Sequence, residues 1–359
     1  MKSNLMGFRR LHNLCIAGAE TEAPGQVVQR LGALQAQDYM QSLWALGSRL
    51  SSGNVADIER AIAERQLLLT WVQRGTIHMV PSEDVEWMLR LAAPRVLRSA
   101  KTRLEQLELD ERTLEKCRRI IYDALKGHKV ITRPALMELL EQSGISTSGQ
   151  RGYHILWTSA YHGLICFGPV SGKQQTFVLL DEWVPDSRDL SFEESLSELA
   201  RRYFTSHGPA TVQDFAWWGG LTLGDARNGL DMFKGELVSE LLDGLEYWMP
   251  NTSVDVPHDE DVYLLAGFDE FILGYKDRSA VLEPQYAPLI VPGNNGIFLP
   301  TVVAGGQVIG TWRRTIKKKG VEITFSPFQD IGRIRAEVLQ QAERYAAFMG
   351  LPLIKAEFL

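Results

Sequence analysis

The chain repeats one order of elements, helix, helix, turn, helix and hairpin, and this repeat constrains its fold more than any other feature of its 359 residues. The order is clearest between residues 110 and 180, where Thr132 can cap a helix that has Pro134 in its first turn. A loop at 168–172 then separates two short strand-like runs. We expect helices over 114–125, 133–144 and 150–162 and strands over 164–167 and 176–180. This order is typical of a winged helix.

The same order returns after residue 191 and, less regularly, before residue 81. In the later copy Gly208-Pro209 breaks the chain between two helices, and Asp243-Gly244 is a hairpin turn. Its helices are expected over 191–206, 211–218 and 222–233 and its hairpin over 237–249. In the N-terminal copy we expect helices over 5–17, 25–34, 40–46 and 55–65 and strands over 67–72 and 76–80. This copy has one helix more than the motif needs.

After Pro250 the sequence changes to short strands, expected over 262–266, 297–303, 307–312 and 321–325, and a final helix over 331–349. The predicted fold class is therefore α+β, with three tandem winged-helix motifs that form a concave DNA-binding scaffold. A small β-meander and a terminal helix follow. The predicted divisions are 1–105, 106–188, 189–252 and 253–359.

Positive charge is concentrated in two places, although the net charge of the chain is −6. Residues 90–133 hold twelve Lys and Arg against six Asp and Glu, a local net of +6 that leaves −12 elsewhere. A second cluster without any acid lies toward the tip of a predicted hairpin, where packing does not explain it and side chains can reach a phosphate backbone. The candidate DNA-binding residues are Arg74, His78, Arg95, Arg98, Lys101, Arg313, Arg314, Lys317, Lys318 and Lys319.

Several other classes of protein find no support in the sequence. No continuous apolar run approaches the roughly 20 residues that cross a bilayer, and the N-terminus lacks the apolar core of a secretion signal, so we expect a cytoplasmic protein with no membrane partner. Cys15, Cys117 and Cys166 are widely spaced and odd in number, which predicts buried free thiols. No glycine-rich phosphate loop, HExxH or GxSxG motif occurs in a suitable context, so we predict no nucleotide cofactor.

Two further groups of residues are expected to be structural. His258, Asp259, Glu260 and Asp261 are consecutive, and their side chains would diverge in a strand or a helix, so we predict no metal site. The charged residues of 269–278 are expected to form a salt-bridge network rather than a cleft. Aromatic residues at helix positions usually pack in the core, which is expected of Trp157, Trp217 and Trp218.

The most informative segment is Gln35-Ala36-Gln37, which follows Leu31-Gly32-Ala33-Leu34. Two amides two residues apart can aim together only if the backbone is extended or bent there. Spacing alone favours a structural role, in which Gln35 and Gln37 cap helix ends or bond neighbouring carbonyls. Asp38 is the nearest carboxylate, and its side chain is expected to point away from theirs.

This segment resembles the QxQ motif of the AlkZ-like alkylpurine DNA glycosylases, winged-helix proteins that excise alkylated purines and in some members unhook interstrand crosslinks. Residues 70–78, 207–218, 267–278 and 296–314 also look familial, so the likeness covers most of the chain. Some relatives carry an acid in place of the second glutamine, whereas Gln37 places this chain with the QxQ group. The resemblance implies that Gln35 and Gln37 are the catalytic pair and that a hairpin over 303–308 enters DNA near the lesion.

An amide cannot act as a general base, so the glutamine pair favours a DNA glycosylase that acts on purines already made cationic by alkylation at N7 or N3. No Lys stands beside the pair to make a Schiff base, so we expect a monofunctional enzyme. Its expected partner is double-stranded DNA, and we expect a monomer without a cofactor. Bulky adducts and crosslinks fall within the same substrate class. Two other functions fit the repeated modules and the basic clusters: a non-catalytic winged-helix DNA-binding protein or regulator, in which the glutamines are structural, and a protein-interaction scaffold. Base release identifies the glycosylase, whose glutamine pair must line a basic channel. Steep salt dependence of DNA binding separates both DNA-binding functions from the protein-interaction scaffold.

Overall fold

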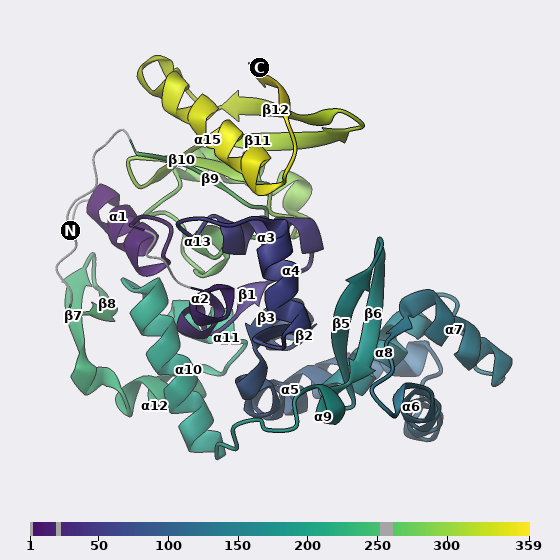
Figure 1. Ribbon diagram of the computed structural model, residues 1–359. Coiled ribbons are helices and arrows are strands. Elements are labelled where there is room, and N and C mark those ends of the chain that lie inside the picture. Colours follow the sequence, from purple (N-terminus) through teal and green to yellow (C-terminus); the bar gives the residue numbers. More distant parts are fainter. Residues whose placement is uncertain (1–2, 19–22, 252–260) are drawn as a thin grey trace. The chain divides into compact units, whose positions relative to one another are not determined.

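The protein combines helices and strands along its whole length, and the computed structural model describes residues 3–18, 23–251 and 261–359 (Figure 1). It is a mixed α+β protein, as predicted. The chain forms two compact units: unit 1 comprises Met1–Ile58 and Leu196–Leu359, and unit 2 comprises Glu59–Ser195. Helices α4 (Val55–Ala63) and α10 (Phe192–His207) contain the two points of passage between the units. The four finer divisions named above remain predictions.

Unit 2 contains five antiparallel strands in the order β3-β2-β5-β6-β4 and the helices that pack on them. Its strands are β2 (Leu67–Trp71), β3 (Ile77–Pro81), β4 (Ile131–Thr132), β5 (Ile165–Ser171) and β6 (Gln174–Leu179). Its helices are α5 (Val85–Gln106), α6 (Glu111–Leu125), α7 (Arg133–Gln142), α8 (Arg151–Tyr161) and the short α9 (Leu180–Trp183).

The elements from α6 to β6 follow the predicted order. The Thr132 hydroxyl accepts a hydrogen bond from the Ala135 N–H at 3.4 Å and caps α7, as its sequence predicts. The predicted loop at 168–172 is wrong in part, because β5 continues to Ser171 through a bulge and the turn is confined to Gly172-Lys173.

Helix α5 is absent from the sequence-based expectations, although its 22 residues make it long. Only its first turns are buried, through Val85, Trp87, Met88 and Leu89. The rest is mostly polar and contains Pro94. A weak apolar period interrupted by a proline does not predict a helix.

Unit 1 brings both ends of the chain together in one structure. Its N-terminal elements are α1 (Ser3–Asn13), α2 (Pro24–Leu31), β1 (Leu34–Gln35) and α3 (Tyr39–Gly47). After α10 come α11 (Val212–Gly219), α12 (Leu223–Asp231) and the hairpin of β7 (Leu237–Leu242) and β8 (Leu245–Pro250). This order agrees with the copy predicted after residue 191. The helix predicted over 25–34 is shorter, since α2 ends at Leu31.

The C-terminal part of unit 1 is a five-stranded sheet in the order β13-β12-β11-β10-β9. The strands are β9 (Val262–Leu265), β10 (Thr301–Ala304), β11 (Gln307–Lys317), β12 (Gly320–Pro327) and β13 (Leu353–Phe358), and the helices are the short α13 (Glu270–Leu273) and α14 (Ala287–Ile290) and the longer α15 (Arg335–Phe348). The predicted meander is confirmed in β10 to β12, but β13, which pairs in parallel with β12, was not expected.

An aromatic cluster joins α3 and α15 to this sheet. The rings of Trp44 and Trp312 lie 5.1 and 4.9 Å from that of Tyr345. Each indole also donates a hydrogen bond of 2.8 Å to a carbonyl of β9, Trp44 to Leu264 and Trp312 to Leu265. These contacts fix α3, which directly follows the glutamine pair, on the edge of the sheet.

Other sequence expectations can be checked in both units. Cys15, Cys117 and Cys166 are buried free thiols, as predicted. Trp157 and Trp218 are buried, while Trp217 is half-buried with the Arg278 guanidinium 5.2 Å from its ring. Among the described residues no helix is both long and apolar enough to cross a membrane.

Candidate active site

Gln35 and Gln37 lie on a short segment between α2 and α3 of unit 1. Gly32 ends α2 with a φ of 81°, a conformation that favours glycine. Leu34 and Gln35 then form β1, and the chain bends at Gln37 before α3 begins. The expectation of an extended or bent backbone at the glutamine pair is confirmed.

The two glutamines differ in exposure. Gln35 is 7% exposed and Ala36 is 3% exposed, whereas Gln37 is exposed. Burial restricts the rotamers of the first side chain, while the second remains accessible to solvent. The pair therefore combines the Gln35 amide, which is restricted by burial, with the Gln37 amide, which is accessible to a ligand.

Asp38 acts as the cap of α3. Its Oδ1 accepts a hydrogen bond of 3.1 Å from the Gln41 N–H, and a carboxylate at this end of a helix also interacts favourably with the helix dipole. The Asp38 carboxylate therefore has a structural role as the cap of α3.

A fully buried carboxylate, that of Glu270, contacts the backbone of Gln35. Glu270 Oε1 accepts a hydrogen bond of 3.1 Å from the Gln35 N–H. Its Oε2 accepts one of 2.9 Å from the Trp218 indole and lies 3.4 Å from His207 Nε2. Sequence reasoning missed this contact, which joins residues 235 positions apart. The available signal was an ionisable residue inside an apolar run, Phe268 to Leu273.

The neighbouring Asp269 forms a buried ion pair with Arg49. Two parallel hydrogen bonds of 2.8 and 2.9 Å join the guanidinium to the carboxylate, and both side chains are at most 1% exposed. Burial alone would lower the pKa of Arg49, but Asp269 outweighs it and the pKa is raised. Asp269 Oδ1 also caps α13 by accepting a bond of 2.9 Å from the Phe271 N–H. The predicted structural pairing is confirmed for Asp269.

His207 is held in the same interior. Its ring stacks on Tyr203 at 4.7 Å, and its Nδ1 lies 2.7 Å from Ser206 Oγ. Burial lowers the pKa of His207, and the bond to Glu270 opposes that shift only in part. The imidazole is consequently neutral near pH 7.

The segment that carries Asp269 and Glu270 is packed too closely for a larger residue at Gly274. A Cβ added there would lie 2.6 Å from both His207 Cδ2 and the Glu270 carbonyl oxygen. The Tyr275 hydroxyl donates a hydrogen bond of 2.7 Å to the His207 carbonyl, and the Tyr203 hydroxyl donates one of 2.7 Å to the Gly274 carbonyl. These reciprocal bonds tie α10 to the segment after α13.

The two candidate DNA-binding residues at the β2–β3 turn occupy different environments. Arg74 is partly exposed in the turn with a φ of 53°. His78 is fully buried on β3, with its Nδ1 3.0 Å from the Thr76 carbonyl oxygen. The buried His78 side chain has no surface for a phosphate in this conformation, and its role in DNA binding stays a prediction.

Arg95, Arg98 and Lys101 lie along one side of α5, because residues three apart share a helix face. Arg98 and Lys101 are exposed and line a hollow of about 710 Å³ together with four acids, Glu105, Glu108, Asp110 and Glu111. Arg95 is half-buried. The structure thus presents two of these three cations fully to solvent.

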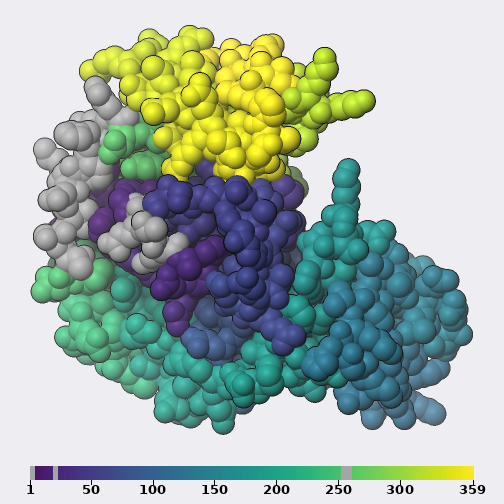
Figure 2. Space-filling view, in the orientation of Figure 1, coloured from purple at the N-terminus to yellow at the C-terminus, as the bar shows by residue number. Residues whose placement is uncertain are grey.

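The C-terminal basic cluster belongs to the β11–β12 hairpin, whose tip projects from the surface of unit 1 (Figure 2). Lys318 and Lys319 are the two residues of its turn, and they are exposed together with Arg313 and Lys317. Lys317 Nζ lies 3.5 Å from a carboxylate oxygen of Glu322. Arg314 faces the other side of the sheet, where it donates a bond of 2.9 Å to the Tyr345 hydroxyl.

The hairpin over 303–308 is packed rather than projecting. Its turn residue Gly306 is buried against α1, so closely that a Cβ added to Gly7 would lie 2.0 Å from the Gly306 carbonyl oxygen. The implied entry of this hairpin into DNA is therefore not supported by its position.

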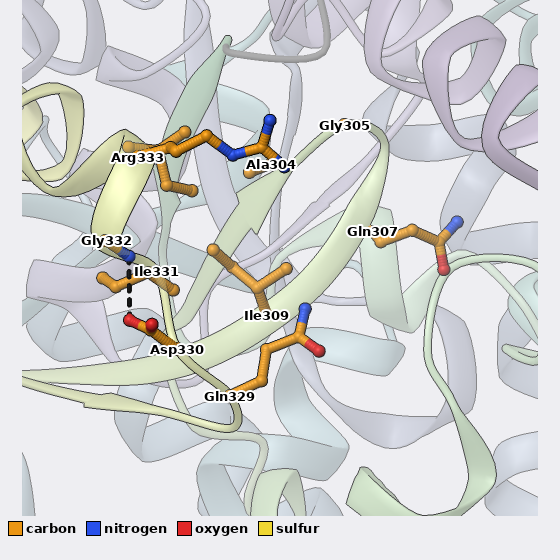
Figure 3. A pocket seen from close by; sticks show the side chains of 10 residues that line it. Ala304, Gly305, Gln307, Ile309, Gln329, Asp330, Ile331, Gly332 and Arg333 are labelled. Carbon is orange, nitrogen blue, oxygen red and sulfur yellow. Dashed lines mark hydrogen bonds between the residues drawn. The ribbon is translucent and has the colours of Figure 1, made fainter.

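A hollow of about 730 Å³ lies beside the β10–β11 turn, with Ile309 in its middle and Gln307, Gln329 and Arg333 around it (Figure 3). Neither Gln35 nor Gln37 lines it. Within 3–18, 23–251 and 261–359, no group of three potential ligands could hold a metal ion. The run His258-Asp259-Glu260 lies outside the described residues.

The fold and these features define a mixed α+β protein with a glutamine pair on a fixed segment and exposed cations on both of its units. The family model of the AlkZ-like DNA glycosylases matches residues 28–348, and the chain belongs to this family of enzymes. An interstrand DNA cross-link repair glycosylase of Streptomyces sahachiroi is 26% identical over 349 residues, which cover 89% of each chain. The solved structure of the DNA glycosylase AlkZ from that organism matches with a TM-score of 0.78, 23% identity and full coverage of both chains.

Proposed function

We propose that this protein is a monofunctional glycosylase that hydrolyses the N-glycosidic bond of N7- and N3-alkylated purines in double-stranded DNA, with Gln35 and Gln37 as its catalytic pair. The observation that carries the proposal is the Gln35-Ala36-Gln37 segment, which has a buried amide on an extended strand and an exposed amide at the bend that follows. Membership of a glycosylase family supports the reaction type.

Two amides suit a cationic substrate because an amide is neither a general acid nor a general base near pH 7. Alkylation at N7 or N3 already places a positive charge on the purine. The C1′–N9 bond then breaks with its electron pair passing to the base, which leaves neutral, and the sugar becomes oxocarbenium-like. Gln35 and Gln37 hold a water that bonds to C1′, and the proton of that water passes to solvent.

The same chemistry sets the limits of the substrate class. Bulky adducts and interstrand crosslinks attached through N7 or N3 also leave the purine cationic, and the glycosylase of Streptomyces sahachiroi is named for crosslink repair. Neutral adenine or uracil would need a stronger acid or base, worth roughly 10²- to 10⁴-fold in rate. No lysine adjoins the glutamine pair in the sequence, so a Schiff base and strand cleavage are not part of the proposal.

DNA binding is assigned to the exposed cations of each unit and to winged-helix modules within residues 1–252. Arg98 and Lys101 on α5 and Lys318 and Lys319 at the β11–β12 turn can neutralise phosphates without reading sequence. Such contacts position a duplex and leave the choice of base to the site.

The test is release of 7-methylguanine from duplex DNA under single-turnover conditions, quantified by mass spectrometry. Gln35→Ala and Gln37→Ala should each slow release by roughly 10²- to 10³-fold, as the loss of a transition-state donor does elsewhere. Gln142→Ala, which removes an exposed glutamine on α7, is the matched control and should keep the wild-type rate. DNA binding by the wild type without release of any N7- or N3-alkylated purine would support a non-catalytic DNA-binding protein instead.

A further inference from the structure

We propose that Glu270 is a positioning residue for catalysis, whose buried carboxylate holds the Gln35 backbone where the amide side chain must act. This inference rests on the proposed function, because it assumes that Gln35 is catalytic. It concerns a second residue, far away in the sequence and never in contact with the reacting atoms.

The contact is direct and local to the catalytic segment. Glu270 Oε1 accepts the Gln35 N–H at 3.1 Å, in an environment where Glu270 is fully buried and Gln35 is 7% exposed. A hydrogen bond to an ionised acceptor is roughly twice as strong as one between neutral groups. Low local dielectric strengthens it further. The backbone of a two-residue strand is thereby tied to the interior of unit 1.

The carboxylate is itself fixed from several sides. The Trp218 indole donates a hydrogen bond of 2.9 Å to Glu270 Oε2, and His207 Nε2 lies 3.4 Å from the same oxygen. The preceding residue, Asp269, is bonded twice to Arg49 and caps the helix that Glu270 begins. Rotation of the Glu270 side chain would break its bonds with Gln35 and Trp218 together, so these two bonds hold the carboxylate in place.

Only a carboxylate satisfies both N–H groups at once. Gln35 and Trp218 each donate to a different oxygen of Glu270. A glutamine at this position has one acceptor oxygen and one NH₂, so one of the two donors would face another donor. An aspartate keeps the charge but is one methylene shorter, so it cannot keep both bonds without movement of the backbone.

Positioning matters here because neutral amides contribute through geometry. A water held between two amides is productive only when both lie within about 0.5 Å of their places. Release of the Gln35 N–H would let β1 shift while the DNA-binding cations of the hairpin and α5 stay where they are. The expected signature is slower chemistry at unchanged DNA affinity.

The experiment compares wild type, Glu270→Gln and Glu270→Asp in the full chain on duplex DNA with 7-methylguanine. Each variant is first confirmed to be folded at the assay temperature. Both should release base roughly 10- to 100-fold more slowly in single turnover, with a Kd for the same DNA within about twofold of wild type. A rate equal to that of the wild type, or a parallel loss of rate and affinity, would overturn the positioning role.

Asp214→Asn is the matched control for stability. Asp214 is a buried carboxylate of the same unit that accepts bonds from the Thr211, Lys276 and Asp277 N–H groups and has no bond to Gln35. This variant should be less stable and yet, while folded, keep the wild-type rate. A slowing as large as that of Glu270→Gln would mean that loss of any buried carboxylate in unit 1 suffices, which contradicts the proposal.

Amide hydrogen exchange of the wild type gives a test that needs no variant, because the Gln35 N–H should exchange far more slowly than that of exposed Gln37. In folded Glu270→Asp, exchange at Gln35 should be selectively faster. Rapid exchange at Gln35 in the wild type refutes the anchor. A wild type that releases no alkylated purine would instead defeat the proposed function and leave the hydrogen bond itself measurable.

Discussion

Replacement of Asp269 by Asn tests how strongly the interior beneath the glutamine pair depends on one ion pair. The change keeps the shape of the side chain and an oxygen that can cap α13. It removes the negative charge that meets the Arg49 guanidinium at 2.8 and 2.9 Å in a site where both side chains are at most 1% exposed. Arg49 is then a buried cation without its bidentate partner.

The magnitude follows from the cost of leaving one charge behind. Breaking a buried ion pair by removing one partner typically costs about 3–5 kcal/mol. Two features place this case at the lower end. Arg49 also donates a bond of 2.6 Å to the Ala45 carbonyl, and Glu270 attracts its charge as well. We therefore expect Asp269→Asn to lose about 3 kcal/mol of unfolding free energy, or about 6–12 °C in Tm for a unit of this size.

Urea unfolding and calorimetry of the full chain would measure this loss. The comparison variant is Asp231→Asn, which breaks the exposed pair with Lys234 at 2.7 Å and should leave Tm close to the wild-type value. Adding Arg49→Met to Asp269→Asn should recover part of the loss, because no buried charge is then left over. A loss below roughly 1 kcal/mol for Asp269→Asn would refute the reasoning, since exposed ion pairs contribute that little.

Three further outcomes are expected. Gly47→Ala should destabilise unit 1 by about 1–3 kcal/mol in urea unfolding, because its Cβ would lie 2.2 Å from the Phe348 ring; Gly235→Ala, where the same atom meets open space, is the control. Burial raises the pKa of Glu198, but the bonds from Arg201 and Arg202 outweigh this effect and lower the pKa to about 2. The ionised carboxylate should therefore stabilise the fold above about pH 4.5, and this contribution should be lost as the pH falls toward 2. Glu198→Gln should make the free energy of unfolding depend less on pH in this acid range. The double change Lys318→Ala and Lys319→Ala should reduce the slope of log K for DNA against log salt by about 1.8 if each lysine contacts one phosphate, and an unchanged slope would remove the hairpin from the DNA interface.

Local signals in the sequence predicted much of the secondary structure. The cap at Thr132, the break at Gly208-Pro209 and the turn at Asp243-Gly244 all lie where local chemistry places them. Each depends on a few adjacent residues. Elements whose stability depends on distant partners were missed or misplaced: β13 pairs in parallel with β12, and α5 buries only its first turns. The final helix begins at Arg335 rather than 331, after a single 3₁₀ turn.

The candidate site divides in the same way. An amide pair on a bent or extended backbone is readable from Gln35-Ala36-Gln37, since spacing and the preceding Gly32 are local. The burial of His78 and the packing of the 303–308 turn on α1 were not readable, because each depends on tertiary neighbours. Alternating charges at 269–278 predicted structural pairing but did not identify the partners, which for Asp269 and Glu270 include Arg49, Gln35, Trp218 and His207.

The proposed catalytic pair is neutral and the interior next to it is charged, and these two properties are complementary. Enzymes that use acids and bases can tune a pKa, but an amide has none to tune, so its contribution depends on where it is held. In this chain the Gln35 N–H donates a hydrogen bond to the fully buried carboxylate of Glu270, and the preceding residue, Asp269, is held by the Arg49 guanidinium. Removal of the charge at Glu270 should therefore slow chemistry while DNA still binds, whereas removal of the lysines at the hairpin turn should weaken binding while bound DNA still reacts. If one change lowers only the rate and the other lowers only the affinity, then positioning of the Gln35 amide and binding of the duplex are separate functions.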